Sequence, residues 1–216
     1  MLQGRLVEPT DHFEREARRC GYRCIAGIDE AGRGPLAGPV VAAAVILPAC
    51  CRLTGVNDSK QLTEIEREEQ YQIIVRRAIG IGVGMATEFE IDCVNILEAT
   101  RMAIRRAISA LGVRPDCLLT DAVDLPGLRI HLRAIIKGDS LSRSIAAASI
   151  VAKVTRDRLM VEHHRIYPQY NFSSHKGYGT EEHLQKLAEH GPCPLHRRTF
   201  APVAAVVDGF TPEDVV

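Results

Sequence analysis

One apolar stretch limits the architecture more than any other segment. Residues 39–48, PVVAAAVILP, carry no polar side chain, so a strand formed there is buried on both faces. Such a strand needs a packed layer on each side of its sheet. The longest apolar run, residues 40–51, is interrupted by Pro48 and is too short to cross a bilayer. The stretch therefore predicts a strand of a sheet that helices cover.

The remaining chain alternates between strand-like and helix-like segments. Further strands are expected at 23–30, 78–87, 115–122 and 128–139, and helices at 10–20, 64–79, 90–111, 141–165 and 180–190. Thr63 and Glu66 fit a capping box at the start of one helix. Residues 78–87 alternate glycine with apolar residues, so something should approach that strand closely. Short early links suggest hairpins and a later strand–helix–strand segment suggests a parallel crossover, which together predict an α/β fold with a mixed sheet.

Acidic side chains recur at the ends of the expected strands. Asp29 and Glu30 close the first strand, Asp121 the fourth and Asp139 the fifth. Ligand sites of open α/β sheets lie beyond the carboxyl ends of parallel strands. Carboxylates crowded there repel each other unless cations hold them. An all-oxygen ligand set favours a hard ion, Mg²⁺ or Mn²⁺.

Each acid also has a simpler interpretation. Neighbouring strand residues point to opposite faces, so Asp29 and Glu30 share one site only if the strand ends or distorts there. A single strand-end aspartate is commonly a turn or cap residue, and Asp139 could cap the next helix. Asp124 competes with Asp121 for the role at the fourth strand. The hypothesis of a metal site depends on the joint pattern.

The segment GRGPLAG, residues 32–38, follows the first acids directly. It matches neither GxxxxGK[ST] nor GxGxxG, so a nucleotide-binding loop is disfavoured. Gly32 and Gly34 could let backbone amides approach a phosphodiester, with Arg33 held between them. The alternative is a plain turn.

Basic and aromatic residues supply candidate substrate contacts. Ser149, Lys153 and Asp157 fall on one face of the 141–165 helix, where a solvated Lys–Asp pair is the alternative. The segments SSHKGYGT (173–180) and HRRTFAPV (196–203) suit phosphate contact and stacking, although such loops also occur without a function. Lys and Arg number 27 and so do Asp and Glu, so the total charge gives a nucleic-acid partner no support.

The other features are those of an ordinary intracellular protein. The seven cysteines show no zinc or disulfide spacing, and the first twenty residues contain no apolar signal segment. We therefore expect reduced thiols and a cytoplasmic protein without a membrane partner, most simply a monomer.

Several motifs together resemble those of the ribonuclease HII family, the type 2 ribonucleases H. They are GIDEAGRGPLAGP (27–39), DSKQL (58–62), LLTD (118–121), KGD (137–139), SIVAKVTRD (149–157) and HKGYGT (175–180). They cover the chain from about residue 23 to about residue 203, and their order makes the resemblance specific. One departure is Ala122, where the family commonly has glycine after the third aspartate.

The resemblance implies an RNase H-like fold with a five-stranded mixed sheet flanked by helices. Residues 1–165 would form the catalytic core with a short N-terminal helix, and residues 166–216 a small C-terminal helical extension of the same domain that holds substrate. By position, the resemblance implies that the metal ligands are Asp29, Glu30, Asp121 and Asp139. It implies that Gly32, Arg33 and Gly34 contact the 2′-hydroxyl and the adjacent phosphate, that Lys60 contacts a phosphate, and that Tyr178 stacks on a sugar. It also implies that Ser149, Lys153 and Asp157 support the site.

The implied activity is hydrolysis of the RNA strand of RNA–DNA hybrids and nicking 5′ of single ribonucleotides in duplex DNA. Two Mg²⁺ or Mn²⁺ ions would take part, and the products would carry 5′-phosphate and 3′-hydroxyl ends. The alternatives are a ribonuclease HIII-like nuclease without junction preference and an inactive hybrid-binding module.

Overall fold

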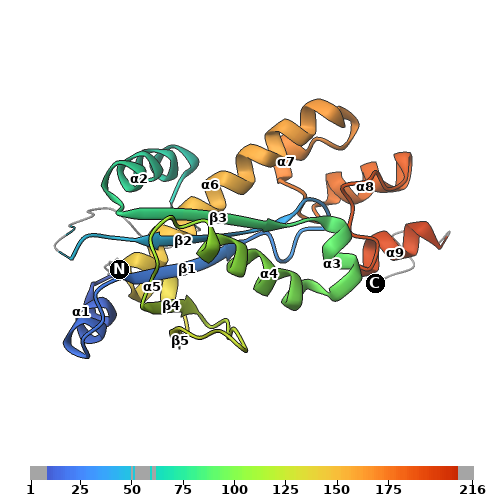
Figure 1. Cartoon of the computed structure of the whole chain (residues 1–216). Coiled ribbons are helices and arrows are strands. Elements are labelled where there is room, and N and C mark those ends of the chain that lie inside the picture. The colour runs from blue at the N-terminus through green and yellow to red at the C-terminus, as the bar shows by residue number, and fades with distance from the viewer. Residues whose placement is uncertain (1–8, 50, 52–58, 60–61, 209–216) are drawn as a thin grey trace, which may run out of the picture.

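A single mixed sheet forms the middle of the molecule (Figure 1). The computed structural model describes residues 9–49, 51, 59 and 62–208. The strand order is β3-β2-β1-β4-β5. The strands are β1 (Ile25–Ala31), β2 (Val40–Ile46), β3 (Gly80–Ala86), β4 (Cys117–Asp121) and β5 (His131–Ile135). Since β2 is antiparallel to both neighbours and β4 is parallel to β1 and β5, four strands point their carboxyl ends to one edge.

Helices cover both faces of this sheet, as the apolar stretch predicts. They are α1 (His12–Arg19), α2 (Glu64–Arg77), α3 (Glu88–Val94), α4 (Ile96–Ser109), α5 (Gly138–Leu141), α6 (Arg143–Ile166), a 3₁₀ turn (Pro168–Tyr170), α7 (Phe172–His175), α8 (Glu181–His190) and α9 (Ala201–Val207). Every residue of β2 is buried. Its side chains divide between an α4 core and an α6 core, on opposite faces of the sheet (Figure 1).

The glycines of β3 explain how closely α4 packs on the sheet. A Cβ added to Gly82 would lie 2.0 Å from the carbonyl oxygen of Ala107, and one added to Gly84 would lie 2.3 Å from that of Ala103. Such distances exclude any side chain at either position. The predicted close approach to this strand is therefore confirmed, and the approaching element is helix α4.

Two of the expected elements were wrong in extent. The helix expected at 90–111 is two helices, because Asn95 takes a positive φ of 76° and its side chain caps α4. The strand expected at 128–139 covers only His131–Ile135, and Lys137 turns the chain with a φ of 57°. Asp139 therefore lies in the short helix α5 and does not close a strand.

The capping box at Thr63 is confirmed. Its side chain accepts from the backbone N–H of Glu66, whose carboxylate accepts from the N–H of Thr63 at 2.8 Å. A second capping box at Thr87 and Glu90 begins α3 and was not predicted. These contacts fix where the chain turns from loop to helix on either side of β3.

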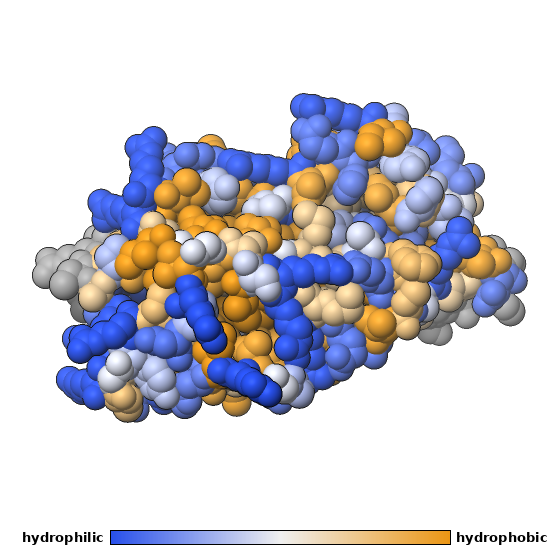
Figure 2. Space-filling model, in the orientation of Figure 1, coloured by the Kyte–Doolittle hydropathy of each residue, from blue (hydrophilic) through white to orange (hydrophobic). Residues whose placement is uncertain are grey.

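The C-terminal helices α7, α8 and α9 gather at one end of the sheet (Figure 1). Charged side chains cover much of the face shown in Figure 2, with an apolar area over β3 and α4. Ile79, next to β3, and Met85, within it, are exposed apolar residues. None of the helices in the described part of the chain is both long and apolar enough to span a bilayer.

Candidate active site

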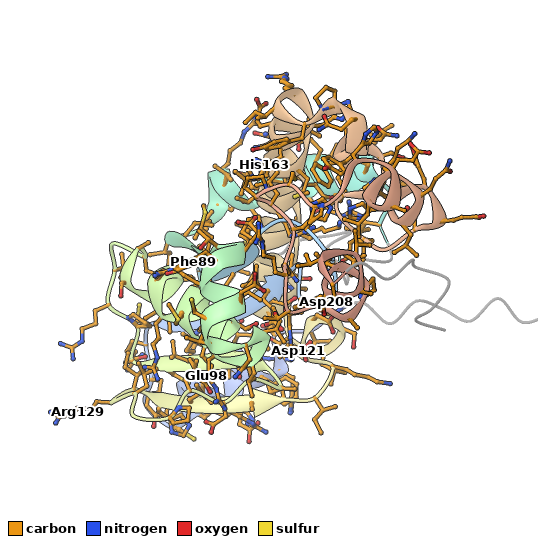
Figure 3. All side chains as sticks on the ribbon, turned by 90° about the vertical axis from the view of Figure 1, so that its right-hand side faces the viewer. Phe89, Glu98, Asp121, Arg129, His163 and Asp208 are labelled. Atoms are coloured by element: carbon orange, nitrogen blue, oxygen red, sulfur yellow. The ribbon has the colours of Figure 1, made fainter. Side chains whose placement is uncertain are left out.

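Three of the predicted acids meet at one open cavity. Asp29 and Glu30 are the last two residues before Ala31, which ends β1, and Asp121 ends the neighbouring parallel strand β4. The cavity has a volume of about 470 Å³. Its walls also include the start of the glycine loop, residues 32–38, together with Ser59, with Ser149 and Lys153 of helix α6, and with Tyr178 from the loop between α7 and α8. Figure 3 looks onto this end of the sheet, with Asp121 in the lower layer beneath the C-terminal helices.

Burial and crowding together raise the pKa of the most buried of these acids. Asp29 is only 5% exposed. Burial raises the pKa of its carboxyl well above the usual value, and the charges of Glu30 and Asp121 raise it further, whereas a hydrogen bond from Ser149 lowers it. The edge of the sheet thus concentrates more negative charge than it can solvate.

The fourth acid, Asp139, lies beside this group on α5. The backbone N–H of Gly138 donates to Oδ1 of Asp121 at 2.8 Å, which joins the start of α5 to the end of β4. Asp139 is 6% exposed. Among the described residues it is not one of those that line the cavity. The competing Asp124 is exposed, away from the cavity, and its carbonyl accepts from Arg101.

The chemistry of these residues fits a hard divalent cation. All the donors are carboxylate oxygens, and a cation would relieve the repulsion that raises the pKa of Asp29. In the ranges that the structure describes, however, no three His, Cys, Asp or Glu side chains form a group that could hold a metal ion as they stand. Arg33 Nη1 lies 3.2 Å from Glu30 Oε1. Binding an ion would therefore require these carboxylates to close around it.

The glycine loop serves two purposes. Gly32 has a φ of 94°, and a Cβ there would lie 2.0 Å from Nε of Arg156, so its bare side admits an arginine. A Cβ on Gly34 would meet no described atom within 4 Å, and Gly34 lines the cavity. Gly34 therefore presents bare backbone to the cavity, whereas Gly32 is needed for the protein's own packing, and the ligand contacts expected of both glycines stay predictions.

Helix α6 supplies the polar wall of the cavity. Ser149 Oγ lies 2.9 Å from Ser59 Oγ. Lys153 Nζ pairs with Asp157 Oδ1 at 2.7 Å and lies 5.9 Å from the centre of the Tyr178 ring. Tyr178 is 44% exposed, so its ring is accessible from the cavity. Lys60, which was also predicted to bind phosphate, lies outside the described residues.

Sequence reasoning missed Arg67 on helix α2. Its Nε donates to the carbonyl of Ser59 at 2.9 Å, and its Nη1 lies 3.6 Å from Asp157 Oδ2. Arg67 thus ties Ser59 to the helix that carries Lys153. A lone arginine in a helix full of charges gives no signal for this role.

The basic residues of segment 196–203 divide between the interior and the surface: His196 and Arg197 are buried, whereas Arg198 is exposed, so the predicted phosphate contact remains open to Arg198 alone. His196 is 2% exposed and Arg197 is fully buried. His196 shares a hydrogen bond of 3.1 Å with His183, and it packs against Tyr170 and Phe172. His175, from the 173–180 segment, is also buried, whereas Tyr178 is accessible. Histidines interleaved with glycine thus stabilise the C-terminal helices.

Comparison with known proteins gives one consistent family. The family model described as Ribonuclease HII matches residues 26–203. A Ribonuclease HII of Citrifermentans bemidjiense is 59% identical over 191 residues, which cover 88% of this chain and 83% of the relative. One of Desulfitobacterium hafniense is 55% identical over 208 residues, covering 96% and 80%. The crystal structure of ribonuclease H2 from Pyrococcus horikoshii superposes with a TM-score of 0.75 at 28% identity, covering 87% of this chain and 99% of that one.

Proposed function

The chain belongs to the ribonuclease HII family and is a ribonuclease H, and on that premise we propose that it hydrolyses the RNA strand of RNA–DNA hybrids and nicks duplex DNA on the 5′ side of a single ribonucleotide. One observation carries the proposal. Asp29, Glu30 and Asp121 share a cavity with Gly34 and Tyr178. Groups suited to hydrolysis and groups suited to reading a sugar thus face the same space.

The acids would provide the hydrolytic part of this site. Asp29, Glu30, Asp121 and Asp139 would hold two Mg²⁺ or Mn²⁺ ions, which when bound supply an activated water and stabilise the leaving 3′-oxygen. Ser149 holds Asp29 by a hydrogen bond and so limits how that carboxylate turns. Because the 3′-oxygen would be the leaving group, cleavage would leave 5′-phosphate and 3′-hydroxyl ends.

The glycine loop would supply selectivity for ribose. The 2′-hydroxyl is the group that marks RNA at a given position. Gly34 exposes its backbone to the cavity without a Cβ, and Arg33 is about half exposed beside it. These groups would contact the 2′-hydroxyl and the adjacent phosphate. Gly32, which also lines the cavity, would add its backbone amide.

The helical part would hold the rest of the duplex. Tyr178 would stack on the sugar beyond the ribonucleotide, and Lys153 would approach a phosphate. Asp157 would support Lys153 through their ion pair. Residues 166–216, which carry Tyr178, would form a substrate-holding part of the same domain as residues 1–165, to which helix α6 would add Lys153 and Asp157.

The proposal is tested with end-labelled duplexes of three kinds: an RNA–DNA hybrid, all-DNA and all-RNA. Each is incubated with Mg²⁺, with Mn²⁺ or with EDTA, and Asp29→Asn serves as the inactive control. We expect cleavage of the hybrid alone, only with metal, and none by the variant. Binding of the hybrid without cleavage would leave an inactive binding module, and cleavage in EDTA would refute the metal site.

A further inference from the structure

Two buried guanidinium groups lie behind the glycine loop. Arg197 donates from Nε to the carbonyl of Gly38 at 3.0 Å, from Nη1 to that of Arg33 at 2.9 Å, and from Nη2 to those of Gly32 and Gly38 at 2.5 and 2.7 Å. Arg156 donates from Nε to the carbonyl of Pro39 at 3.0 Å. All these acceptors belong to one short loop.

The second arginine also reaches the loop that carries the cavity tyrosine. Arg156 donates from Nη2 to the carbonyl of Ala37 and from Nη1 to that of Lys176, each at 3.0 Å. The backbone N–H of Leu36 donates to the carbonyl of Gly177 at 2.8 Å. The Arg156 guanidinium lies 5.9 Å from the centre of the Tyr178 ring. The side chain of Arg156 therefore holds both the glycine loop and the tyrosine loop, residues 176–180.

Burial makes these contacts obligatory. Arg156 is 1% exposed and Arg197 0%. A charge without water is costly unless hydrogen bonds and an opposite charge compensate it. The carbonyls supply the hydrogen bonds, and the partly buried carboxylate of Glu88 interacts favourably with both charges. A planar fork with five donors can satisfy this many carbonyls at once, whereas a lysine ammonium has three donors at one point.

The glycines of both loops leave room for this arrangement. A Cβ on Gly32 would lie 2.0 Å from Arg156 Nε, and one on Gly177 would lie 2.4 Å from the carbonyl oxygen of Ala37. Both glycines have positive φ angles, 94° and 84°. Gly32 thus leaves room for the guanidinium group of Arg156, and Gly177 lets the two loops approach each other closely.

We propose that Arg156 and Arg197 are positioning residues for ribose selectivity: they fix the glycine loop and its separation from Tyr178, so that the loop's amides meet a 2′-hydroxyl. The inference rests on the proposed function and adds to it the residues that set its specificity. Neither arginine lines the cavity among its described walls, so both act through the backbone that they hold.

The test compares binding of two duplexes that differ in one oxygen. Dissociation constants are measured for a duplex with a single ribonucleotide and for its all-DNA counterpart, in Ca²⁺, with a gel confirming that the strands stay intact. The variants are Arg197→Lys and Arg156→Lys, which keep the charge and lose the fork. Arg198→Lys is the matched control, because Arg198 is the exposed neighbour of Arg197.

For the wild-type protein and Arg198→Lys we expect a clear preference for the ribonucleotide. For Arg197→Lys and for Arg156→Lys, that preference should fall at least about fivefold, while the dissociation constant of the all-DNA duplex stays within about twofold of the wild-type value. An unchanged preference in both folded variants would overturn the inference, even if their thermal stability falls. A wild-type protein without any preference would also overturn the inference, because the loop would then set no preference for ribose in binding, whereas the proposed function is refuted separately, by a failure to cut the hybrid with metal.

If neither lysine variant folds, amide hydrogen exchange of the wild-type protein tests whether the glycine loop is fixed. A fixed loop predicts that the amides of residues 33–38 that are hydrogen-bonded exchange only through global unfolding. Leu36 and Gly38 donate such bonds, to Gly177 and Leu195. Their exchange through a low-energy local opening would contradict the inference.

Discussion

The backbone N–H of Gly138 donates a hydrogen bond of 2.8 Å to Oδ1 of Asp121. This contact joins the end of β4 to the first turn of α5, where Asp139 lies. One acid of the proposed metal site thus helps to hold the element that carries another. Its loss would therefore affect both the charge and the geometry of the site.

Two substitutions of Asp121 separate these effects. Asp121→Asn keeps an oxygen acceptor for Gly138, whereas Asp121→Ala removes it. We expect both variants to lose cleavage of the hybrid. Only the alanine variant should lose stability, by about 1 kcal/mol, the usual contribution of one hydrogen bond. Urea unfolding measures the difference, and equal stability of the two variants would show that the Gly138 contact does not stabilise α5.

The turn after Asp121 carries measurable strain. Ala122 has a φ of 55°, in the left-handed region that costs an alanine about 1 kcal/mol. Ala122→Gly should therefore raise the free energy of unfolding, although glycine also gains entropy in the unfolded chain. Thermal unfolding gives the result, with Ala204→Gly in helix α9 as a control that should be destabilising. A lower melting temperature for Ala122→Gly would mean that the methyl group packs favourably.

The ring of Tyr178 provides a test of substrate stacking. Tyr178→Ala should reduce kcat/KM at a single ribonucleotide by about tenfold or more, because a stacked aromatic contributes about 1–3 kcal/mol. Tyr178→Phe keeps the ring and is the matched control, which should retain most activity. If the alanine variant cuts a single ribonucleotide and a long hybrid as well as the wild-type protein does, the stacking role is wrong.

The buried histidines predict how stability depends on pH. The pKa of His183 and that of His196 are both lowered to about 4, mainly by burial and to a smaller extent by the charge of a neighbouring histidine, while a backbone acceptor at Tyr178 partly offsets the effect at His183. Both rings are thus neutral in the folded protein but protonate near pH 6.5 when it unfolds. Their contribution is complete above pH 6.5 and is lost as the pH falls towards 4.

Urea unfolding between pH 7.5 and 4.5 measures this loss. We expect the free energy of unfolding to fall by at least about 2 kcal/mol over that range. The variant His190→Gln, at an exposed position, should follow the same curve as the wild-type protein. A stability that is flat from pH 6.5 to 4.5 would show that the buried pair accepts a proton without cost.

The sequence predicts the edge of the sheet well because strand ends and acids leave a local pattern. Asp29 and Asp121 follow short apolar segments that read as strands, and a continuous apolar stretch locates the covered strand at 39–48. The end of the last strand was wrong, since a single left-handed residue, Lys137, redirects the chain into α5. No residue-level pattern distinguishes such a lysine from one that continues a strand.

The contacts of Arg156 and Arg197 with the glycine loop could not be predicted, for a different reason. Arg197 stands beside Arg198 in the sequence, and both look like surface cations. Only the fold shows that one is buried against the glycine loop and the other is exposed. The carbonyls that hold Arg197 belong to residues more than 150 positions earlier, and a contact of that range is decided by tertiary packing alone.

Incision of a duplex with one ribonucleotide tests the central claim most directly. The duplex is labelled at the 5′ end and incubated with Mg²⁺, Mn²⁺ or EDTA, beside an identical all-DNA duplex. The account predicts a metal-dependent nick on the 5′ side of the ribonucleotide, with a 3′-hydroxyl on the labelled fragment, and no cut in the all-DNA duplex. An intact ribonucleotide duplex under conditions in which a long hybrid is degraded would contradict it.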